Sequence, residues 1–266
     1  MFFADYHTHS INSPDGNETV EQMCLRAIEL GLQELAITDH IDVVTNPQYG
    51  SALDTEAIHR DMRQAQERFA GQLRVVCGAE IGQPQADDRF TEEYCRRYQH
   101  DFLIGSIHNL PQDSDIFFYD YTRVDHHQVY QEYLTELQRL AEGYDFDVMG
   151  HITYPLRYMY QQTGKTPDLT RYEGRFRTLF ATLIEKGRGI EINTSGLRQP
   201  IGELLPPLYL ARLYRACGGE IVTVGSDAHT CGDLGCGIRE GYEMLREAGF
   251  QYVTAYWERK PTFHRL

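Results

Sequence analysis

The chain has 266 residues, about the length of one β/α barrel domain, and 41% of them are hydrophobic, enough for a sizeable core. Its 25 basic and 39 acidic residues give a net charge of −14, which disfavours nucleic acid and anionic membranes as partners. No long uncharged apolar run and no signal-peptide pattern occur, so we expect a cytoplasmic protein without a transmembrane helix.

Short apolar runs alternate with longer amphipathic segments, and no repeat or linker interrupts them, so one domain over residues 1–266 is expected. The expected strands are residues 2–6, 35–38, 73–79, 102–107, 146–149, 189–192 and 221–224, with 252–256 as a final short strand. The expected helices are residues 19–30, 54–70, 128–142, 170–187 and 205–216. The first helix has clear boundaries, since Thr19 and Gln22 form a capping box and Gly31 ends it. Seven strand units favour a parallel β/α barrel or a doubly wound sheet.

Histidine and acidic residues stand at the ends of six of these expected strands. They are His7, His9, Asp39, His40, Glu80, His108, His151, Asp227 and His229. The carboxyl ends of parallel strands open on one face, so we expect these side chains to converge. A lone histidine at a strand end is usually a hydrogen-bonded loop residue, but six of the eleven histidines fall here and none lies in an expected helix. The pattern predicts a metal site, and the remaining histidines are expected to be ordinary surface or helix residues: His59, His100, His126, His127 and His264.

The donor types indicate which metals could bind. Imidazole with carboxylate suits zinc, iron or manganese. With Asp15 there are nine donors besides Asp39, too many for one tetrahedral ion, so two or three divalent ions are expected, with Glu80 and Asp227 as bridging ligands. Paired ions about 3.5–4 Å apart stabilise both reacting oxygens at phosphorus, which favours hydrolysis of a phosphate ester. Thiolate ligation by Cys231 or Cys236 is disfavoured by their glycine-rich surroundings, and all six cysteines are expected to be free thiols.

These donors fall in short motifs: His7-Thr-His9, Thr38-Asp-His40, Gly150-His151 and Asp227-Ala-His229, together with the isolated Glu80 and His108. In this combination the chain resembles the polymerase-and-histidinol-phosphatase (PHP) superfamily over essentially its whole length. The resemblance implies a distorted seven-stranded β/α, TIM-like barrel with a trinuclear site. The three implied ligand sets are His7, His9, Glu80 and Asp227; His40, His229 and Asp15; and Glu80, His108 and His151. Asp15 departs from the histidine found in many members, and is either a ligand or a turn residue of Pro-Asp-Gly.

Within the superfamily the chain is most similar to the histidinol-phosphate phosphatases, through the segments Gly150–Arg157 and Asn193–Arg198. This similarity implies hydrolysis of L-histidinol phosphate to L-histidinol and phosphate by a metal-activated water. Arg157 and Arg198 are expected to hold the phosphate, since guanidinium matches its oxygens in a bidentate fork, or else to pair with surface carboxylates.

Three kinds of neighbouring residue complete the expected site. Asp42 is either the acid for the leaving group, a contact for the substrate's cation, or an exposed loop residue. Asp39 is expected to orient a ligand histidine. Tyr154 and Tyr158 are possible walls for an imidazole ring.

Three other functions fit parts of the sequence. One is a PHP phosphoesterase for a different small ester, such as a nucleotide or sugar phosphate. Another is a 3′-exonuclease-like PHP module, which the charge of −14 and the lack of a polymerase segment disfavour. The third is a metal-sensing or scaffold module, which the full set of donors disfavours. The identity of the metal and the oligomeric state stay open at this stage.

Overall fold

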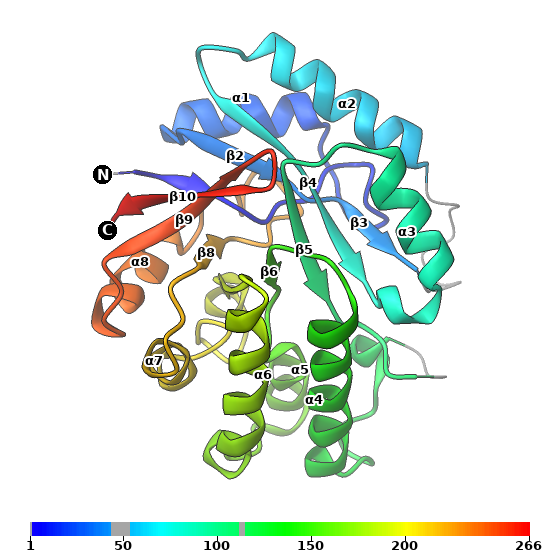
Figure 1. Cartoon of the computed structure of the whole chain (residues 1–266), viewed down its shortest axis with the longest axis vertical. Helices are drawn as coiled ribbons and strands as arrows, with labels where there is room; N and C mark the ends of the chain where they lie inside the picture. Colours follow the sequence, from blue (N-terminus) through cyan, green and yellow to red (C-terminus); the bar gives the residue numbers. More distant parts are fainter. Residues whose placement is uncertain (1, 44–53, 112–114) are drawn as a thin grey trace.

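The computed structural model describes residues 2–43, 54–111 and 115–266, and its central feature is a parallel β-barrel (Figure 1). The barrel strands are β1 (Ala4–Asp5), β2 (Glu34–Ile37), β4 (Arg74–Gly82), β5 (Phe102–Ser106), β6 (Val148–Met149), β7 (Gly189–Asn193) and β8 (Val222–Gly225). Neighbours in this order pair in parallel. β1 and β8 close the circle, because Tyr6 N donates to Val224 O at 3.1 Å and Thr8 bridges Ala228. The predicted seven-stranded parallel barrel is confirmed for the described residues.

Helices surround this barrel (Figure 1). They are α1 (Val20–Leu30), α2 (Thr55–Arg68), α3 (Asp88–Arg97), α4 (His126–Gly143), α5 (Tyr154–Thr163), α6 (Glu173–Glu185), α7 (Leu208–Ala216) and α8 (Ile238–Glu247). α1 has the predicted ends: Thr19 and Gln22 form the capping box, and Gly31 has a φ of 76°. None of the helices that the structure describes is long and apolar enough to cross a bilayer.

Three helices of the structure were not predicted, and a fourth helix begins later than predicted. α3, α5 and α8 lie where no helix was expected. α5 has Pro155 in its first turn, where a missing backbone N–H costs nothing because that group has no partner within a helix. α7 begins at Leu208 rather than at residue 205, because Pro206 and Pro207 precede it.

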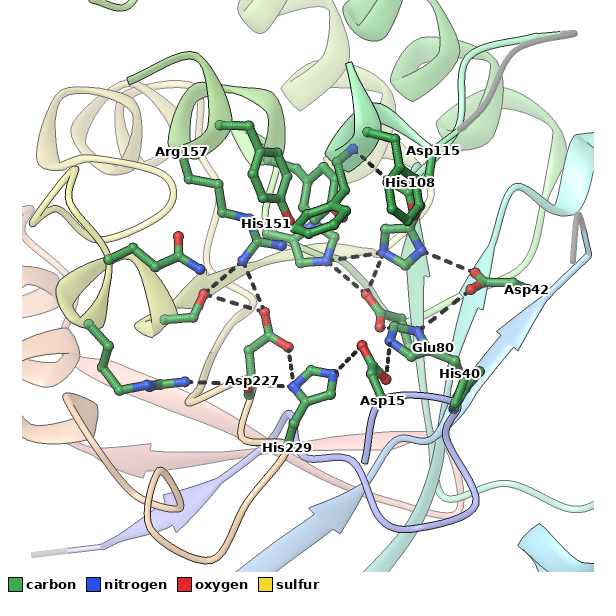
Figure 2. A pocket seen from close by; sticks show the side chains of 18 of the residues that line it. Asp15, His40, Asp42, Glu80, His108, Asp115, His151, Arg157, Asp227 and His229 are labelled. Atoms are coloured by element: carbon green, nitrogen blue, oxygen red, sulfur yellow. Dashed lines mark hydrogen bonds and ion pairs between the residues drawn. The ribbon is translucent and has the colours of Figure 1, made fainter. Parts of the chain in front are cut away.

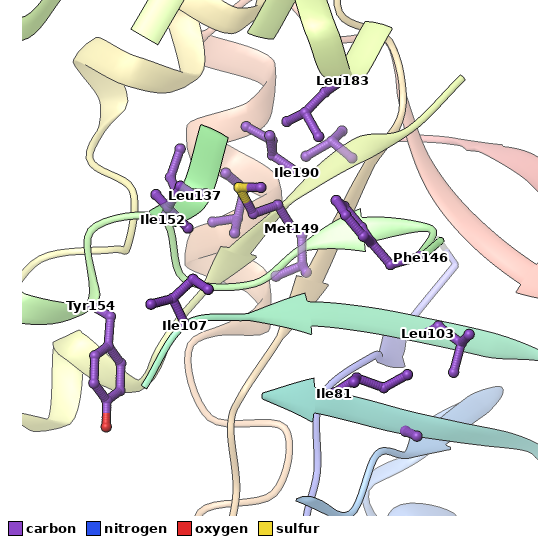
Figure 3. Close-up of a cluster of buried hydrophobic side chains, with 14 of the residues drawn as sticks. Ile81, Leu103, Ile107, Leu137, Phe146, Met149, Ile152, Tyr154, Leu183 and Ile190 are labelled. Carbon is purple, nitrogen blue, oxygen red and sulfur yellow. The ribbon is translucent and has the colours of Figure 1, made fainter. Parts of the chain in front are cut away.

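Alternation along the barrel strands separates two hydrophobic cores. On β4, Val76 points into the barrel, whereas Val75 and Cys77 point outward to the helices. The inner core consists of Ala4, Tyr6, Ala36, Val76, Phe102, Ile104, Val148, Ala255 and Tyr256. The outer core lies between strands and helices, and Figure 3 shows part of it around Met149 and Ile190. The inner core fills one end of the barrel with apolar side chains.

A hairpin of β9 (Tyr252–Trp257) and β10 (Lys260–Arg265) plugs that end. Residues 252–256 are a strand, as predicted, but β9 pairs antiparallel with β10 and joins no barrel strand in the described structure. Tyr256 N donates to Tyr6 Oη at 2.8 Å, and Arg259 Nε donates to Asp147 Oδ2 at 2.6 Å. The hairpin thus ties the end of the chain to the start of the strands.

Two histidines that were expected to be ordinary surface or helix residues are buried. His59 on α2 and His100 before β5 are 7% and 8% exposed, and the Nε2 atom of each lies 3.0–3.1 Å from Tyr94 Oη. Burial, followed by the charge of Arg63, lowers the pKa of His59 to about 4. Burial, followed by the charge of His59, lowers the pKa of His100 to about 3. Both therefore stay neutral in the folded chain at pH values where an unfolded chain would protonate them.

We expect this neutrality to make stability depend on pH. An unfolded histidine binds its proton below about pH 6.5, and folded His100 does not until about pH 3. The contribution of neutral His100 to the free energy of unfolding is thus complete above pH 6.5. It is lost as the pH falls, by about 1.4 kcal/mol per pH unit. His100→Gln should flatten the fall, as measured by chemical unfolding between pH 7 and 4 with a chelator present. His264→Gln, on β10, is the control. If the free energy of unfolding of His100→Gln fell with pH as steeply as in the wild type, the pH dependence could not be assigned to His100.

Candidate metal centre

The predicted donors converge at the carboxyl ends of the strands, opposite the hairpin, on a cavity of about 740 Å³ (Figure 2). The residues lining the cavity include Asp15, His40, Asp42, Glu80, His108, Asp115, Phe117, His151, Tyr154, Arg157, Tyr158, Ser195, Arg198, Gln199, Asp227 and His229. The alternation that buries Val76 also directs Glu80, four residues later on β4, into the barrel. The barrel interior therefore changes from apolar at the hairpin end to polar at the cavity.

Glu80 lies at the centre of the cluster. Its Oε1 atom is 2.8 Å from His151 Nε2 and 3.3 Å from His108 Nε2. Its Oε2 atom is 3.2 Å from His7 Nε2 and 3.0 Å from His40 Nδ1. One fully buried carboxylate thus faces four imidazoles and has the reach to bridge ions between them.

Asp227 faces a second part of the cluster. Its Oδ1 atom is 3.5 Å from His9 Nε2 and 3.7 Å from His229 Nδ1. Asp227 has a φ of 55°, a left-handed conformation that strains a non-glycine residue and occurs often at functional sites. Asp15 points inward, with Oδ2 3.2 Å from His229 Nε2 and Oδ1 3.8 Å from His40 Nε2.

The donors form four overlapping groups in which all ligand atoms lie within 4.8 Å of one another. These groups are His7, His9 and Asp227; His9, His40 and His229; His7, Glu80 and His151; and His40, Glu80 and His108. Six buried atoms of these residues have close ionic neighbours at most and no hydrogen-bond partner in the described structure: His7 Nε2, His9 Nε2, His40 Nδ1, His151 Nδ1, His229 Nε2 and Glu80 Oε2. Unpartnered buried polar atoms are costly, and metal ions would satisfy them. The donor set therefore fits imidazole-binding divalent ions.

The charges of the cluster depend strongly on one another. Burial would raise the pKa of Glu80, but the neighbouring charges of His7, His108 and His40 hold it well below its usual range. Burial, aided by the charges of His229 and His40, holds the pKa of His9 well below its usual range. Glu80 is thus a carboxylate and His9 a neutral imidazole, the forms that bind metals. Burial would lower the pKa of His7, His40 and His108, but the charges of Glu191 beside His7 and of Glu80 beside the other two raise it, so metal binding would displace their protons.

Several supporting residues were missed by sequence analysis. Glu191 on β7 contacts His7 Nδ1 through Oε1 at 2.5 Å and accepts the backbone N–H of His151 at 2.9 Å. This contact leaves His7 Nε2 free to face the cluster. A charged residue inside an apolar strand was the available signal, because a buried carboxylate needs partners. Asp39 acts less directly than expected: it accepts from Ser13 Oγ, which in turn lies 3.2 Å from His9 Nδ1.

The other predicted site residues also reach the cavity. Asp42 Oδ1 lies 3.1 Å from His108 Nδ1, so Asp42 contacts a candidate ligand. Arg157 lies on α5 rather than in a loop after a strand, and its Nη1 donates to Ser195 Oγ at 3.0 Å and to Asp227 Oδ2 at 3.4 Å.

The guanidinium of Arg157 is 4.2 Å from the ring centre of Tyr154 and 5.0 Å from that of Tyr158. Its Nε atom is buried and has no hydrogen-bond partner among the described residues. Arg198 Nη2 donates to Ser226 O at 2.9 Å, and its Nε lies 3.2 Å from Asp233 Oδ1. Arg157 therefore has more capacity left for a ligand than Arg198.

The cysteines have no place in the cluster. All six are free thiols, as predicted. Cys231 Sγ lies 3.8 Å from Met23 Sδ, and Cys236 Sγ contacts Gly232 O, so neither belongs to a candidate ligand group of the described residues. Thiolate ligation is not part of the arrangement.

Comparison with known proteins gives a consistent relationship. Residues 5–195, more than half of the chain, match the family described as the PHP domain. A Deinococcus radiodurans protein named "Probable histidinol-phosphatase" is 27% identical over 94% of this chain and 95% of its own length. The "Histidinol-phosphatase" of Lactococcus lactis is 25% identical over 95% of this chain and 93% of its own.

A solved structure shares the fold. The crystal structure of histidinol phosphate phosphatase from Lactococcus lactis, complexed with zinc, L-histidinol and phosphate, matches with a TM-score of 0.81. The two chains are 24% identical, and the match covers 98% of each. The two chains thus share the same overall fold along almost their whole length.

Proposed function

Because this chain belongs to the PHP domain family, we propose that it is a metal-dependent phosphomonoesterase that hydrolyses L-histidinol phosphate to L-histidinol and phosphate. One observation carries the proposal: buried donor atoms without hydrogen-bond partners are gathered in one cluster, and that cluster borders a cavity that also holds the buried Arg157. The full-length relatives named histidinol-phosphatase support the substrate.

The proposed metal ligands are the nine donors His7, His9, Asp15, His40, Glu80, His108, His151, Asp227 and His229. The overlapping groups support two or three divalent ions, with Glu80 common to two groups. Zinc, iron and manganese all suit such donors, and the zinc in the Lactococcus lactis structure supports zinc. When bound, such ions supply Lewis-acid stabilisation of phosphoryl oxygens and a water acidic enough to attack at neutral pH.

The side chains around the ions supply the rest of the proposed chemistry. Arg157 would bind a phosphate oxygen through its unpartnered Nε–H, and Ser195 fixes the direction of its guanidinium. Arg198 would act from the rim of the cavity. Asp42 contacts His108 Nδ1 through Oδ1, and its Oδ2 lies 3.9 Å from His40 Nδ1. In its protonated form it would be the candidate to protonate the leaving alkoxide. The rings of His7, His9 and His108 are held by contacts at Nδ1 with Glu191, Ser13 and Asp42.

The substrate is tested by comparing turnover of several phosphate esters. Metal-loaded protein should release phosphate from histidinol phosphate with a kcat/KM at least about a hundredfold higher than from a nucleoside monophosphate or a generic aryl phosphate, since a fitted charged contact discriminates by that order. Single-stranded DNA should yield no nucleotides, because the net charge of −14 repels a polyanion. A preference for nucleotides, or equal slow turnover of all esters, would be compatible with the proposed metal site but would contradict histidinol phosphate as the substrate.

A further inference from the structure

Ser13 lies buried in the loop between β1 and α1, and its hydroxyl contacts two candidate metal ligands at once. The residue is 3% exposed. Its Oγ atom accepts the backbone N–H of His40 at 3.1 Å and lies 3.2 Å from Nδ1 of His9. Two residues further along the same loop, Asp15 faces His229. The loop that holds Ser13 therefore contacts every histidine of the candidate group His9, His40 and His229.

The only proton of this hydroxyl is already used in another hydrogen bond. Ser13 Oγ donates it to Asp39 Oδ1 at 2.7 Å. The same carboxylate accepts the backbone N–H and the hydroxyl of Ser10, and it is fully buried, so it depends on these donors. A hydroxyl has one proton to donate and two lone pairs to accept with. Ser13 can therefore only accept from His9, and Nδ1 of His9 must carry the proton of that hydrogen bond.

A proton on Nδ1 leaves Nε2 of His9 with a free lone pair, as a metal ligand needs. Nε2 is the atom that faces the cluster, and it has no hydrogen-bond partner in the described structure. Asp227 Oδ1 lies 3.5 Å from Nε2 and would attract the proton to that nitrogen, where it would block a metal ion. The two nitrogens of one imidazole thus have competing neighbours, and the hydrogen bond made by one of them decides where the proton stays.

We infer that Ser13 is a positioning residue of the metal centre, because its hydroxyl holds the proton of His9 on Nδ1 and fixes the backbone of His40. The inference rests on the proposed metal centre, in which both histidines are ligands. Pro14 and Asp15 line the cavity, whereas Ser13 is not among the described residues that do. Ser13 therefore acts through the two histidines and not by touching the substrate.

Ser13→Ala and Ser10→Ala form a matched pair for testing this role. Both remove a buried hydroxyl from Asp39, but within the described chain Ser10 Oγ bonds only to Asp39 and to the N–H of Asn12. Zinc is removed from the zinc-loaded proteins with a competing chelator, and the free energy of unfolding is measured alongside. Ser13→Ala should raise the dissociation constant of at least one zinc ion about ten- to a hundredfold, as for loss of other partners of metal-binding histidines.

Ser10→Ala should keep the wild-type zinc constants although it lowers the free energy of unfolding, since it also loses a buried hydrogen bond. Wild-type zinc constants in Ser13→Ala would overturn the inference. Equal weakening of zinc binding in both variants would overturn it as well, because the effect would then come from Asp39 or the loop and not from the contact with His9.

The position of the proton is measured directly by NMR of zinc-loaded protein with isotope-labelled histidine. Nδ1 of His9 should carry a proton that exchanges slowly with water in the wild type and in Ser10→Ala, because its acceptor is buried. In Ser13→Ala the same proton should exchange rapidly. A wild-type His9 with its proton on Nε2 would overturn the inference even if Ser13→Ala did not fold. Failure of the proposed metal centre has a different signature, since the wild type itself would then bind no zinc and the inference would fall with it.

Discussion

Replacing Glu80 by glutamine should lower kcat/KM by about a thousandfold or more and release about one metal ion or more per chain. Glu80 is fully buried, and its two oxygens face His7, His40, His108 and His151 at 2.8–3.3 Å. A neutral amide keeps the shape but cannot bridge two ions, and a metal contributes several kcal/mol to the transition state at 1.36 kcal/mol per tenfold in rate. Elemental analysis of the purified variant, alongside kinetics, measures both effects.

Glu34→Gln is the matched control for this substitution. Glu34 is also a buried strand carboxylate, 4% exposed, but it lies at the hairpin end of the barrel with Tyr6 Oη and Arg74 as partners. Its replacement should reduce stability without altering metal content or kcat. Full metal content and full activity in Glu80→Gln would remove Glu80 from the bridging role.

Arg157→Ala should reduce kcat/KM about a hundredfold or more and weaken phosphate binding in parallel. Arg157 is 6% exposed, lines the cavity and stacks on Tyr154, and its buried Nε has no hydrogen-bond partner among the described residues. Loss of a buried charged hydrogen bond costs about 1.5–3 kcal/mol, and loss of the Arg157 charge beside a dianionic phosphate adds to that, so two decades or more are expected. Arg157→Lys should recover only part of the loss, since an ammonium cannot reproduce the fork.

Variants of two other arginines provide comparisons for the Arg157 prediction. Arg188 also stacks on a ring, 4.4 Å from the centre of Phe146, but it lies away from the cavity, so Arg188→Ala should affect stability alone. Arg198→Ala should cost about tenfold, because part of its guanidinium is already bound to Ser226 O and Asp233. The inhibition constant of phosphate should be measured for all four variants. If Arg157→Ala kept the wild-type constant, Arg157 would not be a phosphate-binding residue.

The strand-end donors were predictable because a parallel barrel leaves little choice about where strand ends point. The alternation that sets Val76 inward also sets Glu80 inward, and no detailed packing is needed to infer it. Glu191 was missed for a related reason: it lies inside the run 189–192, before the strand ends, and only the position of His7 on a distant strand gives it a role.

Residues outside the strands were harder to place. Arg157 was expected in a loop after a strand end, whereas it lies on α5, a helix with Pro155 in its first turn. Asp115 carried no sequence signal, since its position depends on Ile116 N bonding to His108 O at 2.8 Å. His59 and His100 share one tyrosine hydroxyl, a three-residue contact that no local pattern encodes.

Because the barrel closes between its first and last strands, the donors of the cluster are synthesised at widely separated times. His7 and His9 precede Asp227 and His229 by more than two hundred residues, so they leave the ribosome before them. At 5–20 residues per second, that interval is on the order of ten to forty seconds. During it the two histidines are an unprotected imidazole pair, open to whichever transition metal binds imidazole most strongly. The complete set of donors therefore exists only after β8 docks on β1 and brings Asp227 and His229 to the two early histidines.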